Sequence, residues 1–218
     1  MATELTAATL EAAFPDIEVI IRPAAESIPA AISHAPTRAF LSTTGLPCEL
    51  HHGAVDIYDL HEGHWETLPE LWEAVRENGW SWTMPETPEH WFSLGGIFGL
   101  GLLVLNGKNG QVWIIPEADE GDLTHVHSGV DSLAYYMYAV QRASTRLTES
   151  YALSVEHDAD DPRDEFDAYL DGARALAVEL YEADPTPFVN GPEEAWEDDG
   201  EGPWAWMLRD IGEGAWAG

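Results

Sequence analysis

Two apolar runs separated by a repeated Asn-Gly turn restrict the folding of this chain more than any other feature of its sequence. Residues 102–105 and 111–115 are almost wholly apolar, and the segment between them holds Asn106-Gly107 and Asn109-Gly110. Asn and Gly both tolerate the positive φ that tight hairpin turns require. We therefore predict a β-hairpin at this position.

The segments before this hairpin alternate between helical and extended patterns. Extended patterns predict strands at residues 17–21 and 55–60. Helical patterns bounded by Pro or Gly predict helices at residues 6–14, 38–43 and 69–79.

The remaining segments extend this mixed pattern. Four glycines at residues 95–101 predict a strand with a bend or bulge ahead of the hairpin. Periodic apolar positions then predict helices at residues 131–151 and 162–183. The order predicts an α+β fold, in which a mixed or antiparallel sheet with a central Asn-Gly hairpin packs against N-terminal and C-terminal helices.

The charge of the chain restricts the classes of partner that it can bind. The chain has 40 Asp and Glu residues but only nine Lys and Arg residues, so its formal net charge is −31. Such a surface repels phosphate backbones and anionic lipids, so we expect neither nucleic-acid nor membrane binding. It attracts basic proteins and speeds encounters with them. The alternative is that the acidity only keeps the protein soluble.

The sequence also predicts a compartment. Cys48 is the single cysteine, so the chain forms no internal disulfide. Its N-terminus lacks the basic region and apolar run of a signal peptide. The longest apolar stretch, residues 94–105, is rich in Gly and too short to span a bilayer. We expect a soluble, cytoplasmic protein.

A group of histidines raises the question of a metal site. Imidazole is a common zinc ligand, but the spacing matches no metal motif such as HExxH, and only one sulfur is nearby. On a strand, His125 and His127 would share a face and could bind a metal or act as acid and base. Two histidines on the same face of a solvent-exposed edge strand explain the pattern equally well. We expect no cofactor and keep a metal site as a minor alternative, with these candidate ligands: His51, His52, His61 and His64.

Patterns of catalysis are weak throughout the chain. Cys48 has no basic neighbour that would lower the pKa of its thiol, and no GxSxG elbow occurs. The glycines at residues 95–101 form neither GxGxxG nor a P-loop. We expect that the protein is not an enzyme.

An ordered set of short motifs resembles the SUKH superfamily. The set comprises FLSTTGLP at residues 40–47, Leu94-Gly95, LLVLNGKNGQVWIIPE at residues 102–117 and Ser132-Leu133. The segment from Asp184-Pro185 to Trp204 and Ile211 is similar to the C-terminal part of the bacterial branch called the fourth SUKH group. The resemblance covers about residues 36–218.

This resemblance implies both a fold and a function. It implies one SUKH-like α+β domain over residues 1–218, with the core motifs in residues 36–150 and a C-terminal helix and Trp-rich acidic tail in residues 151–218. Bacterial members are mostly immunity proteins encoded beside polymorphic toxins, often nucleases or deaminases. A member would bind its cognate toxin and occlude the active site or substrate channel, so the family has no catalytic residues to transfer.

The contact residues must therefore come from the chemistry of this chain. A toxin that acts on nucleic acid has a basic groove, and an acidic loop can imitate the phosphates. Trp is favoured at binding hot spots, and Trp196 lies in an acidic segment, whereas Trp113 is expected in the core. The alternative for any single acidic residue is that it is an ordinary solvated charge that does not contact a partner. The candidates are Asp56, Asp59, Glu62, Glu117, Asp119, Glu120, Asp122, Trp196, Asp198 and Asp199.

Two other function classes stay open at this point. The same fold can serve as a regulatory or scaffold module that binds a protein other than a toxin, and a neighbouring toxin gene would separate the two. A His-dependent metal enzyme would instead show stoichiometric zinc in the purified protein.

Overall fold

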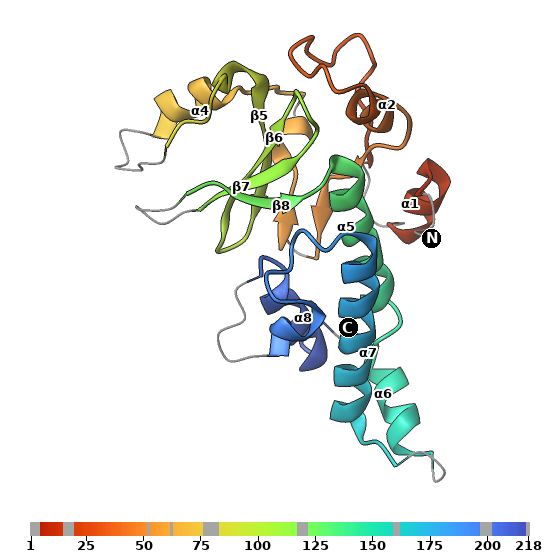
Figure 1. Ribbon diagram of the computed structural model, residues 1–218. Coiled ribbons are helices and arrows are strands. Elements are labelled where there is room, and N and C mark those ends of the chain that lie inside the picture. Colours follow the sequence, from red (N-terminus) through yellow and green to blue (C-terminus); the bar gives the residue numbers. More distant parts are fainter. Residues whose placement is uncertain are drawn as a thin grey trace. The chain divides into compact units, whose positions relative to one another are not determined.

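A computed structural model of the chain (Figure 1) describes residues 5–14, 20–51, 53–61, 63–75, 83–116, 122–158, 162–196 and 202–216. The chain divides into two compact units, Thr3–Met137 and Tyr138–Gly218. Helices and an antiparallel sheet occur together, so the predicted α+β class is confirmed. That residues 1–218 act as one domain stays a prediction.

A six-stranded antiparallel sheet forms the centre of the first unit (Figure 1). Its strand order follows the chain, so each strand pairs with the next one along the sequence. The strands are β3 (Glu49–Leu50), β4 (Val55–Asp56), β5 (Trp91–Ile97), β6 (Gly101–Asn106), β7 (Val112–Pro116) and β8 (Thr124–His127). A separate antiparallel pair joins β1 (Ile20–Ile21) to β2 (Leu46–Pro47).

The repeated Asn-Gly segment connects β6 to β7. The two strands pair from Gly101↔Pro116 to Leu105↔Val112, and the Asn106 amide donates to the Gln111 carbonyl at 2.9 Å. The Gly107 carbonyl accepts hydrogen bonds from the amides of Ser33 and His34 at 2.8 and 3.0 Å. The turn is therefore held by its own residues and by the segment that precedes α2 (Ala35–Thr43).

Glycines let two pairs of neighbouring strands approach closely: β4 with β5, and β6 with β7. The pairing of β5 with β6 shifts register between Ser93 and Gly95. A Cβ atom on Gly95 would lie 1.9 Å from the Asp56 carbonyl oxygen, and one on Gly101 would lie 1.9 Å from that of Ile115. Both glycines have positive φ, 144° and 147°. The glycine-rich sequence thus corresponds to a bulged strand in the middle of the sheet.

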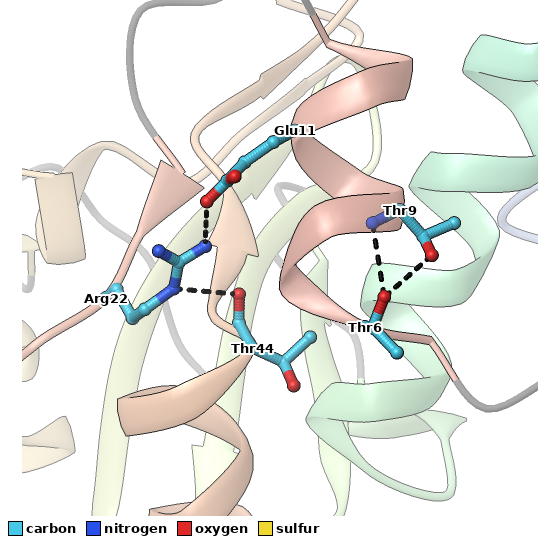
Figure 2. Close-up of polar contacts among 5 residues, drawn as sticks. All are labelled: Thr6, Thr9, Glu11, Arg22 and Thr44. Atoms are coloured by element: carbon cyan, nitrogen blue, oxygen red, sulfur yellow. Dashed lines mark hydrogen bonds and ion pairs between the residues drawn. The ribbon is translucent and has the colours of Figure 1, made fainter.

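Along the chain, the helices of the first unit come before, between and after the strands of this sheet. They are α1 (Ala7–Ala13), α2, α3 (Tyr58–His61), α4 (Leu68–Val75), the 3₁₀ turn η2 (Pro88–His90) and the start of α5 (Val130–Ser144). Figure 2 shows polar contacts near the N-terminus. The Thr6 hydroxyl caps α1 by accepting from the Thr9 amide, and Arg22 donates to Glu11 and to the Thr44 carbonyl at 2.9 and 3.2 Å.

Two predicted elements differ from the observed ones. Residues 55–60 are extended only at their start, in β4: the Ile57 amide still donates to the Cys48 carbonyl in line with the β3–β4 pairing, and the short helix α3 begins at Tyr58. Residues 131–151 form parts of two helices, α5 and α6 (Glu149–Glu156). The Thr148 hydroxyl accepts from the Tyr151 amide at 3.3 Å, and this N-cap begins a new helix.

A cluster of apolar side chains joins α4 to one face of the sheet. Leu68 and Leu71 of α4 are buried together with Trp91, Val104 and Ile115 of the strands. Trp113, expected in the core, is half-buried against this cluster. On the opposite face Leu103, Leu105, Val112 and Ile114 are also buried, so the strands are apolar on both sides.

The second unit is helical. It contains the end of α5, then α6, α7 (Glu165–Ala183), the 3₁₀ helix η3 (Pro192–Trp196) and α8 (Ala205–Gly212). A capping box of Asp164 and Asp167 begins α7, and an ion pair between Arg142 and Glu179 connects α5 to it. Trp204, Met207, Leu208 and Ile211 are buried, so the Trp-rich tail packs as part of the unit.

Candidate partner-binding surface

The structure describes few of the predicted contact residues in full. Asp122 is exposed just ahead of β8. Asp59 lies in α3, but its side chain falls outside the description. The other acidic candidates of the two loops lie outside the described residues: Glu62, Glu117, Asp119, Glu120, Asp198 and Asp199.

Asp56 lies at the β3 side of the sheet. It is half-buried in β4, directly opposite Glu49 of the outer strand β3. Directly opposed residues of an antiparallel pair point to the same face, and like charges in such a pair oppose folding. Two carboxylates are thus placed side by side on this face of the sheet.

Trp196 ends η3 and is half-buried. Its ring lies against α8, because a Cβ atom on Gly212 would come within 3.1 Å of it. Its indole nitrogen is buried and has no hydrogen-bond partner in the described part of the chain, as is also true of Trp113 and Trp206. Much of this side chain therefore belongs to the packing of the second unit.

The histidine candidates do not form a metal centre in the described segments. His51 adopts a positive φ of 38° in the turn after β3, and His64 is exposed. His52 and the side chain of His61 lie outside the described residues. Among the residues that the structure does describe, no group of three or more His, Cys, Asp or Glu side chains could hold a metal ion.

The histidines of β8 make contacts within the protein. His127 is fully buried, and its Nδ1 lies 2.9 Å from the Ser132 hydroxyl. His125 stacks on Trp113 with ring centroids 4.9 Å apart, and its Nε2 lies 2.9 Å from the His127 carbonyl oxygen. These side chains thus support the edge strand and the start of α5.

Two adjoining concavities beside α3 and α4 were not predicted from the sequence. One has a volume of about 460 Å³ and is lined by Gly63, His64, Trp65, Glu66 and Glu70. The other has a volume of about 330 Å³ and is lined by Ile21, Arg22, Pro23, Ser27, Leu60, Gly63 and Trp65. Gly63 and Trp65 belong to both.

Trp65 is fixed by the sheet behind it. Its ring meets that of Phe92 edge-on, with centroids 6.2 Å apart and planes at 89°. The Glu66 carbonyl accepts from the Ser93 amide at 2.9 Å, and Thr67 forms an antiparallel bridge with Phe92. The segment that follows Gly63 is therefore attached to β5.

Glu70 is held by the residue that precedes α4. Its Oε2 accepts hydrogen bonds from the Thr67 hydroxyl at 2.7 Å and the Thr67 amide at 2.8 Å. The hydroxyl bond, and after it the amide bond, lower the pKa of the Glu70 carboxyl against a small opposing effect of burial. Glu70 is therefore a fixed, ionised carboxylate in the first concavity.

A partly exposed Trp such as Trp65 is typical of surfaces that bind other proteins. A comparison with family models agrees with this class: the model described as SUKH-4 immunity protein matches residues 5–202. The chain belongs to the SUKH-4 immunity protein family, and the resemblance seen in its motifs is confirmed. Searches of curated proteins and of solved structures found no match. No helix in the described segments is long and apolar enough to cross a membrane.

Proposed function

We propose that this chain is a cytoplasmic immunity protein that binds a cognate toxin domain and occludes its active site or substrate channel. Membership of the SUKH-4 immunity family over residues 5–202 carries the proposal. The protein acts by binding and not by catalysis, and needs no cofactor. Its partner is the toxin itself, without nucleic acid or membrane.

The net charge of −31 supports a toxin with a basic surface. Nucleases and nucleic-acid deaminases carry basic grooves for phosphate chains, and an acidic protein competes for such a groove. Asp122 is exposed, and Asp56 lies beside Glu49, so both described acidic candidates add to the negative surface of the first unit. The proposed contact set keeps the sequence candidates: Asp56, Asp59, Glu62, Glu117, Asp119, Glu120, Asp122, Trp196, Asp198 and Asp199.

The decisive experiment is co-expression of this chain with the protein encoded next to it. Host survival and co-purification of the two proteins are the expected results. A Gly101→Val variant serves as the control, because a side chain at this position collides with the Ile115 carbonyl and the unfolded chain should not protect. A harmless neighbour that forms no complex would contradict the proposal.

A further inference from the structure

The two adjoining concavities differ in chemistry. The first presents the side chains of His64, Glu66 and Glu70 next to Trp65. The second is largely apolar, with Ile21, Pro23 and Leu60 in its wall beside Arg22, which pairs with Glu11. Their volumes, about 460 and 330 Å³, fall within the range of about 300–1,000 Å³ that is usual for ligand sites.

We propose that these concavities form the anchor site for the toxin: the first takes a basic side chain of the partner, and the second takes an adjacent apolar side chain. The inference rests on the proposed function, because it names the place where the immunity protein grips its target. Of the described residues that line the two concavities, none is among the sequence candidates for partner contact.

A guanidinium or ammonium group fits the first concavity. It can lie on the face of an indole ring, where the electron density attracts a cation, and pair with a carboxylate at the same time. Both hydrogen bonds to Glu70 go to Oε2, and no described residue bonds its Oε1. Oε1 is therefore available to accept from an incoming donor.

The walls of the first concavity are held by contacts with the sheet and with α4. Trp65 packs on Phe92, Glu66 bonds to the main chain of β5, and α4 is docked by buried Leu68 and Leu71. A site whose groups are already in place loses less conformational entropy on binding. These contacts suit an anchor that is formed before the toxin arrives.

Charge selects the occupant. With 40 acidic against nine basic residues, the chain attracts cationic partners, and an anionic segment would meet Glu66 and Glu70. A second copy of this chain is a poor occupant, because two surfaces of the same strong charge repel. A basic toxin with an apolar residue beside a Lys or Arg satisfies both concavities.

The first test uses a blocked dipeptide, acetyl-Arg-Leu-amide, titrated into the full ¹⁵N-labelled chain. We expect saturable shifts of the Trp65 indole N–H and of the Gly63 and Glu66 amides. The Glu66→Gln/Glu70→Gln variant should weaken this binding by about fivefold or more. The control, Glu26→Gln/Glu86→Gln, removes the same charge from exposed residues that line neither concavity and should leave it unchanged.

Three results would overturn the anchor site. They are the lack of saturable shifts, equal binding of acetyl-Glu-Leu-amide, and equal weakening by the two charge variants. None of them depends on the identity of the toxin.

The second test uses the toxin encoded beside the chain. Trp65→Ala should weaken the complex by about tenfold or more, as expected for an aromatic hot spot. Phe166→Ala, which alters a 62% exposed aromatic of the second unit, should leave the affinity nearly unchanged. If Trp65→Ala fails to fold, the Glu66→Gln/Glu70→Gln variant gives the same comparison.

The two tests separate the two proposals. If the wild-type chain does not bind the toxin, the proposed immunity function fails, and the dipeptide titration still decides whether the anchor site exists. If the wild type binds and both the Trp65 and the paired Glu variants bind equally well, only the anchor site is wrong.

Discussion

Gly101 lies where β6 begins, between β5 and β7. Its φ is 147°, and a Cβ atom would stand 1.9 Å from the Ile115 carbonyl oxygen. The clash is with main chain, so only movement of a whole strand could relieve it. Glycine is therefore required at this position, because β6 and β7 approach too closely for a side chain.

We expect Gly101→Ala to lower the free energy of unfolding by about 3 kcal/mol or more, because strain and strand displacement add. Gly99→Ala is the matched control: Gly99 has a φ of 71° in the turn that precedes Gly101, but no heavy atom lies within 4 Å of the position that a methyl group would take there. At Gly99 the cost should be about 1–2 kcal/mol. Urea denaturation measures both, and equal losses would contradict the steric argument.

The Glu70 carboxylate gives stability a pH dependence with a definite sign. Its folded-state pKa is lowered from 4.5, chiefly by the hydroxyl bond from Thr67. The ionised group therefore stabilises the folded state above pH 4.5, and this contribution is lost as the pH falls through the lower folded-state pKa.

We expect wild type to exceed Glu70→Gln in stability at neutral pH by less than about 1 kcal/mol, because the group is exposed. The difference should shrink as the pH drops below 4.5. Urea denaturation of both proteins at several pH values measures it. A difference that stays constant over the whole acid range would show that ionisation of Glu70 is not its source.

At the scale of elements, α4 matters because it positions the acidic concavity. Leu68 is fully buried against strand residues Trp91, Val104 and Ile115. We expect Leu68→Ala to cost about 2–4 kcal/mol through the cavity that it leaves. Leu153→Ala, in a 37% exposed leucine of α6, should change stability by about 0.5 kcal/mol or less. Denaturant titration tests the pair, and similar costs would mean that α4 is not docked as described.

The elements that could be predicted are those whose signals are local. The helix at residues 162–183 has apolar periodicity and a capping box, and the structure has α7 at Glu165–Ala183. The strand predicted at residues 55–60 is extended only over β4 (Val55–Asp56), and its last part is instead the short helix α3 (Tyr58–His61). The break between α5 and α6 depends on one N-cap, Thr148, inside an otherwise helical pattern.

The candidate site shows the same limit more strongly. Its walls come from segments as distant as Ile21, Leu60 and Glu70, and no spacing in the sequence relates them. The sequence does not distinguish Trp65 from the other nine of its ten Trp residues, whereas the structure places it against Phe92 of β5. Composition alone indicated an acidic binding surface, but a concavity is a property of packing.

At the scale of the whole molecule, charge acts on folding and on binding in opposite directions. Forty acidic and nine basic residues leave the folded chain with strong self-repulsion, which screening by salt relieves. Attraction to a basic toxin is screened by the same ions. Raising NaCl from about 0.01 M to about 0.1 M shortens the screening length from about 30 to about 10 Å.

We therefore expect the midpoint of thermal unfolding to rise over this range while the association rate constant with the toxin falls by about tenfold or more. Calorimetry and stopped-flow mixing measure the two quantities, and a neutral osmolyte of equal osmolarity serves as the control because it does not screen charge. A rise in stability without a fall in association rate would assign the acidity to solubility alone. The same salt series is measured on the Glu66→Gln/Glu70→Gln variant. If its association rate constant falls by the same factor as that of the wild type, the charge of the whole chain accelerates the encounter, and the two glutamates act only after contact.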